Sequence, residues 1–73
     1  MNVSVYMILS GRDLFIGTAT NRCTLLSLIE LAKLKDSHGV SLHGMMETGR
    51  VVSGEMSCRD ANELAMDETL QSA

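Results

Sequence analysis

One pattern occurs twice in this chain, and it limits the folds that the chain can adopt. The stretch SGRDLFIGTATNR at residues 10–22 is followed by the similar stretch TGRVVSGEMSCR at residues 48–59. With one deletion in the turn, the alignment matches Gly11 with Gly49, Arg12 with Arg50, Gly17 with Gly54 and Arg22 with Arg59. Each stretch reads as a turn, a strand and the start of a helix. We therefore predict two half-repeats, residues 2–37 and 40–72, within a single domain of residues 1–73.

The first half begins with two strands. Residues 2–10 alternate between apolar and polar side chains, which is typical of a half-buried strand. A Gly-Arg-Asp turn follows, and residues 14–20 return as the second strand of a hairpin. Thr20 or Asn21 can then cap a helix, because either side-chain oxygen can accept a hydrogen bond from an exposed backbone amide. We expect this helix to stop at Gly39.

The second half repeats this order. Residues 40–56 form a predicted hairpin through a Glu-Thr-Gly-Arg turn. Ser57 and Asp60 resemble a helix capping box, and inward-facing alanine and leucine residues follow. The predicted fold is therefore α+β with the order ββαββα. It has one four-stranded antiparallel sheet and two helices packed on the same face, because neither half could bury its apolar side alone.

The apolar residues of the first helix suggest that the chain associates. A chain of 73 residues buries only about 60% of the surface that its unfolded form exposes, and it often needs a second subunit. Leu26, Leu31 and Leu34 widen the apolar stripe of this helix beyond what one small sheet covers. We expect these leucines to form the interface of a symmetric homodimer or to contact an obligate partner.

The acidic residues are concentrated at the end of the chain. Residues 1–54 carry five basic and four acidic residues, whereas residues 55–73 carry one basic and five acidic residues. Most of these acidic side chains belong to the second helix, away from its apolar residues. A compact negative surface attracts and orients a partner with a basic surface. The expected partner-binding residues are Asp60, Glu63, Asp67 and Glu68.

These features favour a non-enzymatic protein–protein interaction module. Very small acidic proteins are common among phage and mobile-element inhibitors, so the expected partner is a basic surface of a host nucleic-acid-handling complex of the defence type. The alternative is a small nucleic-acid-binding or regulatory protein that uses Arg12, Arg22 and Arg50 on the hairpin side. We rank this alternative second, because phosphate neutralisation supplies most non-specific nucleic-acid affinity and the second helix is acidic.

Other site chemistries lack a sufficient pattern. Cys23 and Cys58 stand at predicted helix starts with His43 as a conceivable base, but no third orienting group is evident. The same cysteines with His38 and His43 do not show the closely paired ligands of a zinc motif. No phosphate-binding glycine loop is present. We expect no catalytic residue, no metal and no cofactor.

The N-terminal residues do not resemble a targeting segment. They lack a basic region before the apolar residues, and polar residues interrupt the apolar ones. No apolar run reaches the roughly 18 residues of a membrane span. Two cysteines without a secretion signal suggest free thiols in a reducing compartment. We expect a cytoplasmic protein that makes no membrane contact.

Overall fold

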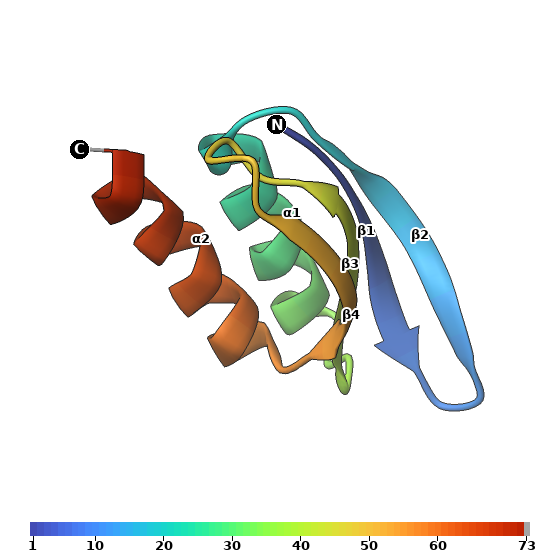
Figure 1. Ribbon diagram of the computed structural model, residues 1–73. Coiled ribbons are helices and arrows are strands. Elements are labelled where there is room, and N and C mark those ends of the chain that lie inside the picture. Colours follow the sequence, from blue (N-terminus) through green and yellow to red (C-terminus); the bar gives the residue numbers. More distant parts are fainter. Residues whose placement is uncertain (73) are drawn as a thin grey trace.

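The chain folds into one sheet covered by two helices. A computed structural model describes residues 1–72, with side chains described through residue 67. The elements are β1 (Asn2–Leu9), β2 (Arg12–Ala19), α1 (Arg22–Leu34), β3 (Gly39–Met45), β4 (Val51–Met56) and α2 (Cys58–Ser72). The strands are antiparallel in the order β2-β1-β3-β4, and both helices cover the same face of the sheet (Figure 1). The predicted α+β fold is confirmed.

The core between the sheet and the helices is aliphatic. β1 buries the alternating residues Val3, Val5 and Met7, and β3 buries Val40 and Leu42. The main contribution from the helices comes from the inward face of α1, formed by Leu25, Ile29 and Ala32. Among the residues of α2 with described side chains, those of the inward face that are buried are Ala61 and Ala65. α2 consequently rests mainly on α1, with a smaller contact to β3.

Both helices begin at capping side chains. The Asn21 Oδ1 accepts a hydrogen bond from the Thr24 N–H over 2.8 Å, and the Ser57 Oγ accepts one from the Asp60 N–H over 3.0 Å. Each bond satisfies a first-turn amide that has no partner within the helix. The cap of α1 is Asn21 rather than Thr20. Counted from the caps, Arg22 at the start of α1 corresponds to Cys58 at the start of α2, and not to Arg59 as in the sequence alignment. Cys23 and Cys58 are therefore offset by one position.

The end of α1 differs from the prediction. The helix ends at Leu34, and Gly39 is instead the first residue of β3. Asp36 adopts a positive φ of 59°, and its N–H donates to the Lys33 carbonyl over 3.2 Å. The Ser37 N–H also donates over 3.2 Å to the Ala32 carbonyl. These two bonds are the Schellman arrangement, so a non-glycine residue provides the stop.

The sheet has the symmetry that two half-repeats would require. β1 and β3 lie side by side at its centre, and β2 and β4 form its two edges. Gly17 pairs with Val5, Gly54 pairs with Leu42, and Val5 and Leu42 pair with each other. The repeat alignment matches these two glycines, and both have a positive φ, 155° and 146°. The origin of this symmetry in a tandem repeat remains a prediction.

Candidate functional site

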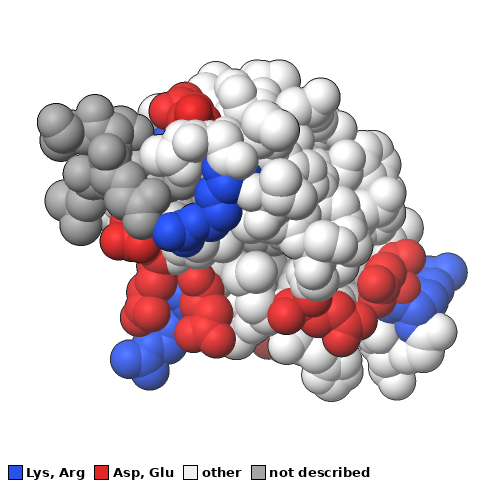
Figure 2. Space-filling view, viewed as in Figure 1, with Lys and Arg blue, Asp and Glu red and all other residues white. Residues whose placement is uncertain are grey.

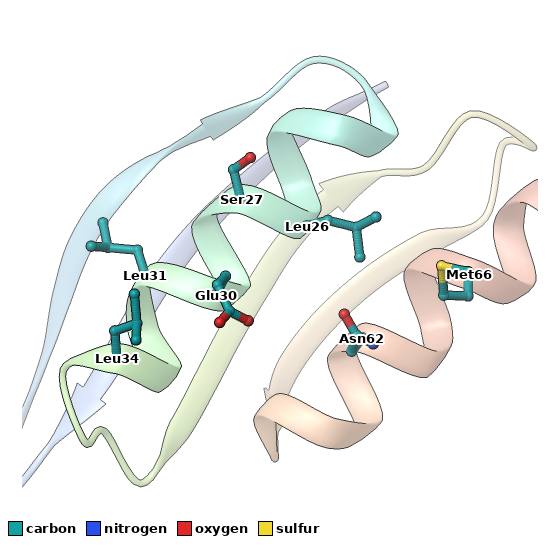
Figure 3. A pocket seen from close by; sticks show the side chains of 7 residues that line it. All are labelled: Leu26, Ser27, Glu30, Leu31, Leu34, Asn62 and Met66. Carbon is teal, nitrogen blue, oxygen red and sulfur yellow. The ribbon is translucent and has the colours of Figure 1, made fainter.

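A shallow groove on the outer side of the helices brings together the leucines predicted for association. We call it the leucine groove. It has a volume of about 540 Å³ and is lined by Leu26, Ser27, Glu30, Leu31, Leu34, Asn62 and Met66 (Figure 3). Leu34 is 74% exposed and Met66 is 48% exposed. Figure 3 shows Leu26 on the side of α1 that faces α2, whereas Leu31 and Leu34 extend from the other side. The apolar surface therefore crosses α1.

The helical period explains why these leucines are not fully covered: Leu26 is partly buried, and Leu31 and Leu34 are exposed. Successive residues of an α-helix are rotated by about 100°, so Leu26 points to one side of the buried stripe of α1. The groove also has a polar boundary, because the Arg22 Nη1 donates to the Met66 Sδ over 3.9 Å. The sheet leaves part of the wide apolar stripe exposed, as the sequence suggested.

A second surface carries the predicted acidic residues, and we call it the acidic flank of α2. Asp60, Glu63 and Asp67 line a hollow of about 460 Å³ together with Leu64. The Arg59 Nε lies 3.6 Å from the Glu63 Oε1, and both side chains are mainly solvent-exposed. Figure 2 shows acidic and basic side chains next to each other near the start of α2, at the lower left. Glu68, the fourth predicted residue, lies outside the part of the chain with described side chains.

A cleft between the helices separates the two surfaces. It has a volume of about 340 Å³ and is lined by Ile29, Glu30, Lys33, Cys58, Arg59, Asn62 and Glu63. It shares Glu30 and Asn62 with the leucine groove and Glu63 with the acidic flank. Asp60 and Asp67 line only the acidic flank among these three hollows, so this flank lies on the side of α2 that faces away from α1.

The three arginines of the alternative function do not form one patch. Arg12 pairs with Leu9 at one end of β2, whereas Arg22 follows the other end of that strand. Arg50 precedes Val51, which lies at the same end of the sheet as Arg22. An eight-residue strand separates the two ends by roughly 25 Å. A nucleic acid would therefore not meet all three arginines on one compact basic surface.

The cysteines and histidines lie in different places. Cys58 lines the cleft between the helices, and its Sγ lies 3.9 Å from the Ser37 Oγ. Cys23 is exposed, and both thiols are free. His43 is on the opposite face of the sheet, so it cannot act as a base for Cys58. Among the residues with described side chains, no group of three or more His, Cys, Asp or Glu could hold a metal ion.

The uncovered face of the sheet carries a row of rings that the sequence did not reveal. Tyr6 of β1 lies between Phe15 of β2 and His43 of β3, with ring-centroid distances of 5.4 Å and 5.6 Å. The His43 Nε2 is 2.7 Å from the Ser41 Oγ, and its Nδ1 is 3.4 Å from the Ser53 Oγ. The rings are tilted at 59° and 81°, so they pack against one another and do not form a flat stacking surface. The sequence signal that could have indicated this row was the strand alternation, which places Tyr6 on the polar side of β1.

No similar protein adds a function to these surfaces. Comparison with protein-family models, curated proteins and solved structures finds no match. Neither helix within residues 1–72 has the length and hydrophobicity that a bilayer crossing requires. The candidate site therefore has two parts: an apolar groove over α1 and the adjoining side of α2, and an acidic flank on the side of α2 that faces away from α1.

Proposed function

We propose that the chain is a small non-enzymatic interaction module that binds a partner protein with a basic surface. The observation that carries this proposal is the acidic flank, where Asp60, Glu63 and Asp67 line one hollow of α2. These residues span about 10 Å along the helix axis, because each residue adds about 1.5 Å. A surface of this length contacts two or three Lys or Arg side chains. It also attracts such a partner before contact and fixes its orientation.

The proposed partner is a component of a nucleic-acid-handling complex. Surfaces that bind nucleic acids are basic because Lys and Arg neutralise the phosphates. A protein that covers such a surface with carboxylates competes with the nucleic acid and thereby inhibits the complex. We assign this activity to the cytoplasm, since Cys23 and Cys58 are free thiols, as is usual in a reducing compartment.

The leucine groove supports the association of two copies. Leu31 and Leu34 are the exposed apolar residues of α1, and the groove lies over α1 and the adjoining residues Asn62 and Met66 of α2. The acidic flank faces away from α1. A homodimer through the leucine groove therefore leaves both acidic flanks accessible, and each copy still binds a partner.

Charge reversal tests the acidic flank. Glu63→Lys with Asp67→Lys is expected to weaken binding to the purified partner at least about tenfold, mainly through a slower association rate. The partner is first isolated from the native host with and without nuclease, so that an indirect contact through nucleic acid is recognised. Binding kinetics at several salt concentrations then compare the wild-type chain with the variant.

A matched variant controls for net charge. Asp13→Lys with Glu47→Lys changes the charge equally at exposed positions of the two hairpins, outside α2. This control is expected to retain nearly all of the association rate. Equal loss of binding in both variants, or binding that survives reversal of the acidic flank at low salt, would show that α2 is not the contact surface.

A further inference from the structure

β4 has an exposed hydrogen-bonding edge. Among the described residues it pairs only with β3, so one side of the strand has no neighbour in the described sheet. The Met46 N–H donates to the Arg50 carbonyl over 2.8 Å, which sets the alternation of the ladder. It follows that Val51, Ser53 and Glu55 direct their N–H and C=O groups away from β3. Six backbone groups on β4 are thus available to another strand within the described part of the chain.

The other edge of the sheet is protected, whereas β4 is not. Along β2 the register shifts opposite Val5 and Tyr6, which interrupts the regular row of outward groups. β2 also begins with the charged pair Arg12 and Asp13. β4 contains no proline, lysine or register shift, and Glu55 is its one charged residue. Natural sheets usually block exposed edges with such features, so an open edge indicates a place for an added strand.

The acidic flank of α2 lies on the same side as this edge. α1 packs over β2, β1 and β3, whereas the contact of α2 with the sheet is centred on β3. Packed helices are separated by about 8–10 Å and neighbouring strands by about 4.8 Å. The side of α2 away from α1 therefore extends toward β4 and beyond it. A strand added to β4 would direct every second side chain toward Asp60 and Asp67.

We propose that the β4 edge binds an extended segment of the partner as a fifth strand, with Lys or Arg at alternate positions facing the acidic flank. This inference rests on the proposed function and specifies the form of the partner at the same surface. Backbone hydrogen bonds to β4 supply affinity, and the alternating cations supply selectivity. A second copy of the chain is a poorer occupant, because pairing β4 with itself would bring two acidic flanks together.

Synthetic peptides test the backbone contribution. The probe is a short capped peptide that alternates lysine with threonine, and binding to the full chain is measured by calorimetry. The first control is the same peptide with N-methyl groups on the amides that would face β4, which keeps the charge but removes the donors. A second control replaces lysine by glutamate. We expect each control to bind at least about tenfold more weakly than the probe.

Variants of the chain test the same edge. Ser53→Pro removes the outward N–H of Ser53, whereas Ser53→Ala keeps the N–H and removes the same hydroxyl, so this pair isolates one backbone donor. We expect Ser53→Ala to bind the lysine peptide like the wild-type chain and Ser53→Pro to bind at least about fivefold more weakly. Amide hydrogen exchange at Val51, Ser53 and Glu55 in the wild-type chain is expected to slow when the peptide is added. Circular dichroism checks that both variants fold. If Ser53→Pro does not fold, the hydrogen-exchange measurement on the wild-type chain still tests the edge.

Three results would overturn the inference. These are equal binding of the N-methylated and unmodified peptides, no slowing of exchange along β4, and concentration-dependent protection of β4 without peptide, which would assign the edge to a second copy. If the natural partner requires Glu63 and Asp67 but binds Ser53→Pro normally, the proposed function stands and the fifth strand is wrong. If reversal of the acidic flank leaves partner binding unchanged, both fail.

Discussion

Gly44→Ala is predicted to be among the most damaging small substitutions in this protein. Gly44 lies in β3 opposite Val3 and has a φ of 147°, a region that side-chain-bearing residues rarely adopt. A Cβ placed on it would overlap the backbone carbonyl oxygen of Asn2 and lie 2.8 Å from the Val3 Cα. These obstructing atoms belong to the backbone of the neighbouring strand, so a change of side-chain rotamer cannot relieve the overlap.

The magnitude follows from two separate costs. Backbone strain at such a φ costs about 1–3 kcal/mol. Forcing β1 away from β3 adds a cost comparable to overpacking a core, about 1–3 kcal/mol. The free energy of unfolding of a 73-residue domain is roughly 4–11 kcal/mol. Gly44→Ala therefore removes a large part of the stability.

Gly54→Ala is the matched control. Gly54 has nearly the same φ, 146°, but no atom lies within 4 Å of an added Cβ. It therefore experiences the backbone strain without the overlap, and the difference between the two variants measures the contact between β1 and β3. Urea unfolding followed by far-ultraviolet circular dichroism gives both free energies. A difference below about 0.5 kcal/mol with equal denaturant slopes would show that the sheet accommodates the Cβ, and would refute the reasoning.

The remaining predictions concern the end of α1 and the leucine groove. Asp36→Gly is expected to raise the free energy of unfolding by about 0.5–1 kcal/mol, because glycine adopts the positive φ at this helix stop without a steric cost; Asp36→Ala should lower it, and a stabilised alanine variant would contradict this explanation. Leu34→Gln is expected to raise the dissociation constant of the proposed homodimer at least about tenfold without loss of stability, since this side chain is 74% exposed. Sedimentation velocity measures the association of Leu34→Gln beside the equally drastic control Val51→Gln, at a position that is 69% exposed. The predicted interface is contradicted if both variants sediment like the wild type.

The sequence predicted the features of the fold that depend on neighbouring residues. Alternation identified β1, the spacing of apolar residues identified α1, and cap-forming side chains located both helix starts. The predicted end of α1 was wrong because Asp36 adopts a conformation that usually indicates glycine, whereas the first glycine that follows the helix in the sequence is Gly39. A local sequence pattern shows where a glycine could end the helix. It does not show that the N–H groups of Asp36 and Ser37 already form the hydrogen bonds that end it.

The arrangement of the candidate surfaces was only partly predictable. Spacing along one helix was sufficient to place Asp60, Glu63 and Asp67 on one side of α2, because that geometry is local. The separation of Arg12 from Arg22 depends on the direction of β2, and the row of rings beside Tyr6 depends on the pairing of three strands. These placements result from long-range register, which the residues of a single strand do not determine.

The small buried face of α2 has a consequence for how the protein opens. Ala61 and Ala65 are its fully buried described residues, whereas α1 anchors itself with Leu25 and Ile29. Within residues 58–67 little apolar area holds α2 in place beyond these alanines and the partly buried Cys58 and Leu64, so the detachment of this part of the helix requires less free energy than global unfolding. The acidic flank belongs to this weakly anchored element. A partner that binds only the docked helix therefore also suppresses its partial unfolding, and part of the binding free energy is spent on keeping α2 in place.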